Sequence, residues 1–252
     1  MTGQLTIVGL GPGDPQCLTL RARSALDTAT DLVGYAPYLT RVPRRPDQQH
    51  HASDNREELA RARHAATLAA SGRRVAVVSS GDAGVFAMAS AVFEVLETGD
   101  PAWRQLDVEV VPGVSAMFAA AARIGAPLGH DFCAISLSDN LKPWSVVTQR
   151  LTAAATAGFT IALYNPRARS RPWQLGAAFD LLRPILPPTT HIAFATAITQ
   201  PDERIHITTL AAADPTLADM RTLVMIGSVA MRRVERSGAR PWLYASREGS
   251  PA

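Results

Sequence analysis

The stretch that most clearly indicates the architecture of this chain is Leu5-Thr6-Ile7-Val8-Gly9-Leu10-Gly11-Pro12-Gly13-Asp14-Pro15. Its first half, Leu5 to Leu10, is a short apolar run typical of a buried strand. Its second half is rich in glycine and proline and predicts a tight loop. The apolar residues of Leu18 to Ala29 then follow the spacing of a helix. A buried strand, a glycine-rich loop and a helix in this order indicate an α/β fold.

The same alternation of strands and helices continues along most of the chain. Further strands are predicted at 31–34, 75–79, 108–111, 132–137, 160–164, 191–194, 205–209 and 222–226. One helix is predicted at 86–96. Another begins at a capping box formed by Asp54 and Glu57 and ends at Gly72, which suits the C′ position. Strands that alternate with helices of about 10–15 residues predict a mostly parallel sheet covered on both faces.

Pro112 and Gly113 form the expected hinge between two halves of the chain. We expect an N-terminal α/β domain over residues 1–112 and a C-terminal α/β domain over 113–235. A polar tail is expected over 236–252, and its last residues, 247–252, are expected to fray.

Composition excludes several classes of protein. The chain has 252 residues, of which 47% are hydrophobic and 19% charged, and its net charge is +3. That charge is modest for a nucleic-acid binder, and no apolar run reaches the ~18 residues of a membrane span. Cys17 and Cys133 lack metal or disulfide spacing, and the six histidines form no recognisable metal constellation. We therefore expect a soluble cytoplasmic protein with no bound metal.

Four loops follow predicted strands at the position where open α/β sheets bind ligands; they span residues 9–15, 79–86, 111–117 and 164–173. The first is no dinucleotide fingerprint, because Asp14 and Pro15 stand where a further glycine should open the helix. Taken singly, each loop has a plain structural interpretation: a tight turn, an Asp82 N-cap, a Ser115 N-cap, or a solvated run of arginines.

In this order along the chain, however, the loops resemble those of the tetrapyrrole methylase superfamily from about Leu5 to Val234. Further stretches are similar to the branch of that superfamily that methylates precorrin-3B at carbon 17: residues 33–39, 79–88, 136–141, 164–173 and 201–204. The resemblance implies two α/β domains, a mostly parallel N-terminal sheet, a mixed C-terminal sheet, a homodimer, and S-adenosylmethionine as methyl donor in a cleft between the domains.

The resemblance also implies a role for individual residues. Expected cofactor contacts are Pro12, Ser80, Gly81, Asp82, Val85, Ser115, Ala116, Asn165, Ala195, Thr196, Met225 and Ile226. Candidate acid–base groups for ring contraction are Asp14, Tyr35, Tyr38 and Lys142. Candidates to bind the substrate and its carboxylate arms are Arg41, Arg44, Arg45, Asp139, Asn140, Arg167, Arg169 and Arg171.

Four alternatives stay open at this point. The substrate could be cobalt-factor III or uroporphyrinogen III; Ala36 speaks against uroporphyrinogen, because its methylases carry an acidic residue there. A relative that methylates ribosomal RNA or a protein histidine should show a basic surface with interleaved aromatics, whereas aromatics are only 6% here. A non-catalytic nucleotide-binding regulator should lack the arginines of Arg167 to Trp173.

Overall fold

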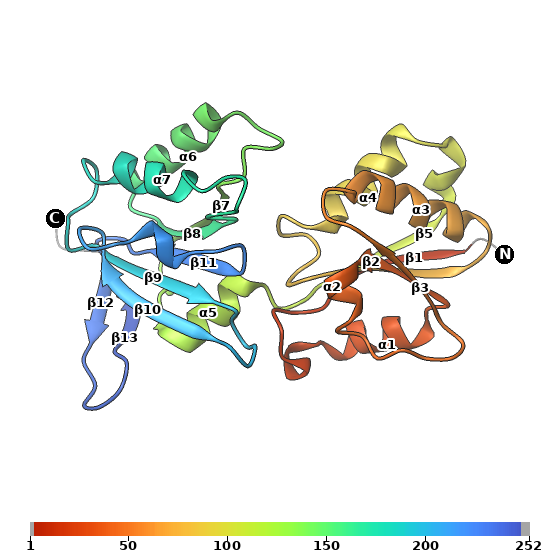
Figure 1. The fold of residues 1–252 in the computed structure, drawn as a ribbon, viewed down its shortest axis with the longest axis horizontal. Helices are drawn as coiled ribbons and strands as arrows, with labels where there is room; N and C mark the ends of the chain where they lie inside the picture. The colour runs from red at the N-terminus through yellow and green to blue at the C-terminus, as the bar shows by residue number, and fades with distance from the viewer. Residues whose placement is uncertain (1–2, 248–252) are drawn as a thin grey trace. The chain divides into compact units, whose positions relative to one another are not determined.

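The computed structural model describes residues 3–247. The chain divides between Ala116 and Met117 into two units (Figure 1), four residues after the expected boundary at Pro112. Each unit is built on a five-stranded sheet. No helix within residues 3–247 is long and apolar enough to cross a membrane.

The first unit is a parallel sheet with helices on both faces. Its strand order is β3-β2-β4-β1-β5, and every neighbouring pair is parallel. The strands are β1 (Gln4–Gly9), β2 (Asp31–Tyr35), β3 (Gln49–Ser53), β4 (Arg74–Ser79) and β5 (Asp107–Val111). The helices are α1 (Leu20–Thr28), α2 (Ala36–Leu39), α3 (Glu58–Ala70) and α4 (Met88–Thr98), with 3-10 turns η1 (Pro15–Cys17) and η2 (Pro101–Gln105).

Successive side chains of β1 point to opposite faces of this sheet. Leu5 and Ile7 pack with the alanines of α3 and the apolar side of α4, whereas Val8 packs with α1 and α2. All three side chains are fully buried. A strand covered on both faces has to be apolar throughout, which explains why β1 reads as a continuous apolar run.

The ends of α3 follow only part of the expected pattern. The Glu57 carboxylate accepts the backbone N–H of Asp54 at 2.9 Å, which is one half of the capping box. Asp54 does not supply the other half, because its Oδ1 accepts the N–H of Asn55 instead. Gly72 follows the helix with φ of +89°, the left-handed conformation expected at C′.

The second unit contains a mixed sheet. Its order is β10-β9-β11-β8-β7, and only β7 and β8 are parallel. The strands are β7 (Phe132–Ser136), β8 (Thr160–Tyr164), β9 (His191–Thr196), β10 (Arg204–Thr209) and β11 (Thr222–Ile226). The helices are α5 (Ala116–Ile124), α6 (Trp144–Thr156) and α7 (Gln174–Leu182), with the 3-10 turn η3 (Pro215–Leu217). Side chains of α6 and α7 pack with the sheet around Phe179 and Phe194.

The expected polar tail contains a strand, so this expectation was wrong in part. A small sheet has the order β12-β13-β6, formed by β12 (Met231–Val234), β13 (Trp242–Ala245) and β6 (Gly125–Ala126). Leu243 and Ala245 are buried while Trp242 and Tyr244 are exposed, which is the alternation of a half-buried strand. Of the stretch expected to fray, residues 248–252 lie outside the described residues.

Candidate active site

Three glycine-containing loops of the first unit meet at the carboxyl ends of neighbouring strands. β1 lies between β4 and β5 in the sheet, and the three loops follow Gly9, Ser79 and Val111. Gly11 and Gly81 exchange two backbone hydrogen bonds, with nitrogen–oxygen distances of 3.0 and 2.9 Å. Open α/β sheets bind ligands at this end of their strands.

The loop backbones approach one another so closely that no side chain fits between them. A Cβ atom on Gly113 would lie 2.2 Å from the carbonyl oxygen of Gly81, and one on Gly9 would lie 2.7 Å from the amide nitrogen of Gly113. Gly9 and Gly113 therefore allow the three loops to meet. Gly81 differs from them: its φ is +64°, but a Cβ atom on it would make only ordinary contacts, the nearest at 3.8 Å from the amide nitrogen of Ala116.

The Asp82 carboxylate connects the second loop to the third. Its Oδ1 accepts the N–H of Gly84 at 2.8 Å, and its Oδ2 accepts the N–H of Gly113 at 3.0 Å. Asp82 is not the N-cap of α4, because that position belongs to Ala87. A carboxylate has about four acceptor positions, so two remain in principle for hydroxyl groups of a ligand.

Arg41 connects the first loop to the second. Its guanidinium donates to Ser80 Oγ at 3.1 Å and to the carbonyl oxygens of Leu10 and Gly11 at 3.1 and 2.8 Å. Burial lowers the pKa of Arg41, and the charge of the nearby Tyr38 phenol opposes that shift. Most of the Arg41 donors are therefore engaged in holding together the first and second loops, where cofactor contacts are expected.

Asp14 caps the turn that ends the first loop. Its Oδ1 accepts the N–H of Gln16 at 2.8 Å, at the start of η1. The same Asp-Pro arrangement caps η2 at Asp100 and η3 at Asp214, with equal distances of 2.8 Å. Capping by itself therefore does not distinguish Asp14 from two other aspartates. What makes Asp14 a catalytic candidate is its place in the first glycine loop, on the side where the substrate is expected.

Tyr35 and Tyr38 lie together where β2 ends and α2 begins. Their rings meet edge to face with centroids 5.2 Å apart. Burial raises the pKa of Tyr38, which the charge of Arg41 opposes, so the phenol is a proton donor at neutral pH. The fourth acid–base candidate, Lys142, belongs to the second unit, where burial lowers the pKa of its ammonium.

In the second unit, the end of β8 carries a strained and well-anchored residue. Asn165 has φ of +51°, and its side-chain nitrogen donates to Ser136 Oγ at 2.9 Å. The Tyr164 hydroxyl accepts the N–H of Met117, at the start of α5, at 3.1 Å. A non-glycine residue in this region costs about 1–3 kcal/mol, and such residues are concentrated at functional sites. Ser136 was not among the residues expected from the sequence, because its role depends on the pairing of β7 with β8.

A buried polar group follows the same loop. Arg171 Nη1 lies 3.5 Å from Asp139 Oδ1, and Gln174 donates to the same oxygen at 3.2 Å. Within residues 3–247, Arg171 Nη1 and Gln174 Oε1 are buried and have no hydrogen-bond partner. Buried polar atoms normally have one, and Asp139 faces Nη1 only at ion-pair distance, so this donor keeps hydrogen-bonding capacity for a second carboxylate. Gln174 was not among the expected residues.

The remaining substrate candidates lie on more open surface. Arg167 and Arg169 line a cavity of about 380 Å³ together with Pro172 and residues 218–221. Arg45 is paired with Asp47 at 2.7 Å. Arg44 and Asn140 are exposed.

The cofactor contacts expected from the second unit are only partly brought together; they are Asn165, Ala195, Thr196, Met225 and Ile226. The Thr196 hydroxyl hydrogen-bonds that of Thr222 at 2.9 Å, at the start of β11. Met225 and Ile226 lie three and four residues further along β11, at about 3.3 Å per residue, and they pair with the start of β8. Ile226 is in the core. The structure does not bring these two residues to the end of the sheet that carries Asn165 and Thr196.

Comparison with known proteins agrees with this arrangement of loops. The family model of Tetrapyrrole (Corrin/Porphyrin) Methylases matches residues 4–214. A protein of Sinorhizobium named precorrin-3B C(17)-methyltransferase is 55% identical over 247 residues, which are 98% of this chain and 97% of that protein. A Salmonella typhimurium protein named probable cobalt-factor III C(17)-methyltransferase is 40% identical over 89% of this chain and 92% of its own length.

A solved structure extends the agreement to three dimensions. The crystal structure of the methyltransferase CobJ superposes with a TM-score of 0.93 at 50% identity, and it covers 97% of this chain and 100% of its own. The expected fold class, with a parallel first sheet and a mixed second sheet, is thereby confirmed. The chain belongs to the tetrapyrrole (corrin/porphyrin) methylases.

Proposed function

We propose that this chain transfers a methyl group from S-adenosylmethionine to carbon 17 of precorrin-3B and contracts the macrocycle to give precorrin-4, a step of cobalamin biosynthesis. The observation that carries the proposal is the meeting of three glycine loops at the ends of β4, β1 and β5. The 55% identity to the Sinorhizobium enzyme supports the choice of substrate. A homodimer in the cytoplasm is part of the same proposal.

The first-unit loops fit a ligand with hydroxyl groups and a charged amino-acid end. When bound, S-adenosylmethionine supplies a methyl group that its sulfonium already activates, and it leaves as S-adenosylhomocysteine. Asp82 has spare acceptor positions for hydroxyls. The backbone around Gly81 admits close approach because no Cβ atom stands there. Pro12, Ser80, Val85, Ser115 and Ala116 complete the proposed contacts from the first unit.

The residues of the chain then have two tasks in the reaction. Arginines hold the carboxylate arms of the tetrapyrrole, with Arg171 the best placed because its buried Nη1 is ion-paired with Asp139 but has no hydrogen-bond partner among the described residues. Holding the ring carbon in line with the methyl group supplies much of the rate enhancement. Ring contraction also moves protons, and Asp14, Tyr35, Tyr38 and Lys142 are the proposed donors and acceptors.

One alternative substrate has a specific observation in its favour. The Salmonella relative is named for cobalt-factor III and is 40% identical over most of both chains. The higher identity to the precorrin-3B enzyme favours the metal-free substrate.

The test is to incubate the protein with S-adenosylmethionine and either precorrin-3B or its cobalt counterpart, and to determine the mass and absorption spectrum of the product. We expect precorrin-3B to gain one methyl group and the spectrum to change as the ring contracts. Methylation of the cobalt compound alone would establish the alternative, and binding of S-adenosylmethionine without transfer to either compound would contradict the proposal.

A further inference from the structure

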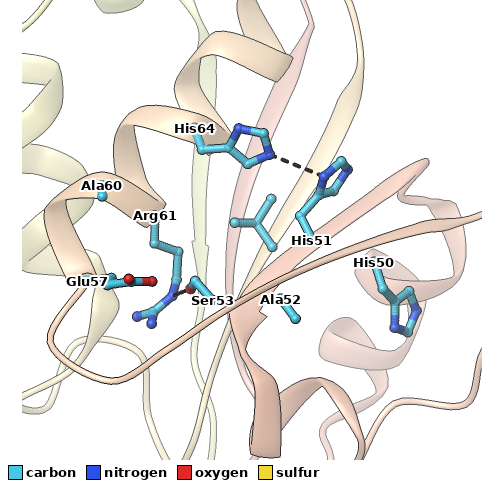
Figure 2. Close-up of a pocket in the computed structure, with 9 residues that line it drawn as sticks. His50, His51, Ala52, Ser53, Glu57, Ala60, Arg61 and His64 are labelled. Carbon is cyan, nitrogen blue, oxygen red and sulfur yellow. Dashed lines mark hydrogen bonds between the residues drawn. The ribbon is translucent and has the colours of Figure 1, made fainter.

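A cavity of about 450 Å³ lies in the first unit between the edge strand β3 and the helix α3 (Figure 2). It is lined by Val33, by residues 50–53 of β3, and by Glu57, Ala60, Arg61 and His64. None of these residues belongs to the glycine loops. The proposed methyl transfer therefore assigns no role to the residues of this cavity.

Two histidines in this cavity point their ring nitrogens at one another. His51 Nδ1 and His64 Nε2 are 3.2 Å apart, and the ring centroids are 4.9 Å apart. In a tetrahedral zinc site with Zn–N bonds of 2.0–2.1 Å, two imidazole nitrogens lie about 3.3 Å apart and their ring centroids about 5.2 Å apart. The free protein thus already holds the two rings at the separation that one metal ion requires.

A buried carboxylate fixes the orientation of His51. Asp31 Oδ1 lies 2.8 Å from His51 Nε2, and Asp31 has no exposed surface. The other oxygen of Asp31 accepts from Arg73 at 2.6 Å and from Thr30 at 2.7 Å. Because the carboxylate requires the proton on Nε2, Nδ1 of His51 carries the lone pair. Metal-binding histidines usually have such a carboxylate behind them.

A cation can bind between His51 and His64 without either histidine losing or gaining a proton. In the free protein His64 Nε2 donates to the lone pair of His51 Nδ1. When a cation binds between the nitrogens, the proton of His64 moves to its own Nδ1, which frees Nε2 as a ligand. His64 is exposed at the surface of α3, so its Nδ1 has access to water.

The charged side chains that line the cavity are of opposite sign. Arg61 remains positive while its guanidinium donates to Ser53 Oγ and to the Asp54 carbonyl oxygen, both at 2.7 Å, and Glu57 is negative. No group of three or more His, Cys, Asp or Glu side chains able to hold a metal occurs within residues 3–247, so water has to complete the coordination.

We propose that His51 Nδ1 and His64 Nε2 bind a divalent transition-metal ion of the zinc class, with Asp31 as the carboxylate that positions His51. The site is independent of the proposed methyl transfer. This site was not predictable from the sequence, because the two ligands are 13 residues apart and β3 has no apolar pattern that predicts a strand.

The test is a calorimetric titration of the protein, free of any histidine tag, with Zn²⁺, followed by a Co²⁺ titration observed in the visible spectrum. We expect one equivalent to bind and the cobalt bands to show nitrogen coordination. The His64→Gln variant should bind at least tenfold more weakly. Its fold should persist, because His64 is exposed.

The matched control is His50→Gln. His50 neighbours His51 in the sequence but lies on the opposite face of β3, where its Nε2 is 3.4 Å from Gln48 Oε1, and Figure 2 shows it pointing away from the pair. This variant should bind zinc as the wild type does. An Asp31→Asn variant should bind about 10–100-fold more weakly if it acts through His51. The absence of stoichiometric binding, or equal affinity in the His64→Gln variant, would overturn the proposal.

Discussion

The Asp82 carboxylate accepts the backbone N–H of Gly113 across 3.0 Å, and this bond joins two loops that are 31 residues apart in the sequence. With the Gly11–Gly81 backbone pair, it gives all three loops at the strand ends a common set of hydrogen bonds. The proposed cofactor contacts of the first unit are therefore preorganised in the free protein. Preorganised contacts lower the entropic cost of binding a ligand.

The first prediction concerns Asp82. In an Asp82→Asn variant the side chain keeps one acceptor oxygen, so either Gly84 or Gly113 loses its partner. A hydrogen bond to a charged group contributes about 1.5–3 kcal/mol, and we expect the affinity for S-adenosylmethionine to fall about ten- to a hundredfold in equilibrium dialysis. Asp100→Asn is the control, since Asp100 makes the same kind of cap at η2. If Asp82→Asn bound S-adenosylmethionine as tightly as the wild type, this carboxylate would have no role in cofactor binding.

A second prediction separates backbone strain from loop contact at Gly81. Gly81→Ala introduces a Cβ atom at φ of +64°, where it costs about 1–2 kcal/mol and occupies the space next to Ser115 and Ala116. Gly158→Ala carries similar strain at φ of +79°, but nothing lies within 4 Å of its Cβ position. We expect both variants to lose comparable thermal stability. Only Gly81→Ala should also lose affinity for S-adenosylmethionine, and an equal loss in both would contradict the proposed contact.

Strongly apolar segments of the fold were predictable from the sequence. The strands Thr160–Tyr164 and Thr222–Ile226 were predicted with the bounds that the structure has, because buried central strands have to be apolar on both faces. β3 (Gln49–Ser53) was missed. As an edge strand it is held by backbone pairing with β2, and its polar side chains show no alternation.

The candidate site was predictable only as a set of loops. Strand order does not follow from local pattern, so the sequence could not indicate that β1 lies between β4 and β5. The contacts of Asp82 with Gly113 and of Asn165 with Ser136 depend on that kind of long-range pairing. The place of Met225 could not be predicted for the same reason, because antiparallel register sets its position on β11.

The third prediction concerns acid stability through Asp31. Burial alone raises the pKa of this carboxyl, but hydrogen bonds from Thr30, His51 and Arg73 outweigh it and hold the pKa below its ordinary value. A folded-state pKa below the unfolded one stabilises the fold above the unfolded pKa of about 4, and this contribution is lost as the pH falls through the folded value.

The measurement is the free energy of unfolding in urea at several pH values between neutral and strongly acidic. Wild type should exceed Asp31→Asn by about 1–3 kcal/mol at pH 7, the cost of disrupting a buried charged hydrogen-bond set. The difference should shrink on acidification. The exposed Asp202, paired with Arg221, is the control, and Asp202→Asn should change little. If the difference in unfolding free energy between wild type and Asp31→Asn stayed constant with pH, the lowered pKa of Asp31 would be contradicted.

A fourth prediction concerns the buried guanidinium of the second unit. Arg171→Gln removes the Nη1 atom that has no hydrogen-bond partner, and we combine it with Asp139→Asn so that no carboxylate is left without its cation. We expect the KM for the tetrapyrrole to rise at least tenfold, while the affinity for S-adenosylmethionine is unchanged. Arg183→Gln is the control because that arginine is exposed and paired with Asp180. An unchanged KM in the folded double variant would remove Arg171 from substrate binding.

The last prediction decides between capping and catalysis at Asp14. Asn at this position keeps the Oδ1 atom that accepts the Gln16 N–H, so the turn and cofactor binding should survive in Asp14→Asn. A carboxylate that moves a proton cannot be replaced by an amide, and positioned acid–base groups contribute about 10²–10⁴-fold. We therefore expect the rate constant of a single turnover of the tetrapyrrole to fall at least about a hundredfold.

The control for Asp14 is Asp214→Asn, because Asp214 caps η3 with the same Asp-Pro geometry. If the role of Asp14 were only structural, both variants would retain full turnover, since both keep the capping oxygen. A loss of turnover confined to Asp14→Asn, with unchanged thermal stability and unchanged S-adenosylmethionine affinity, is the result that a catalytic carboxylate predicts. Near-native turnover would leave Tyr35, Tyr38 and Lys142 as the remaining groups able to move the protons of ring contraction.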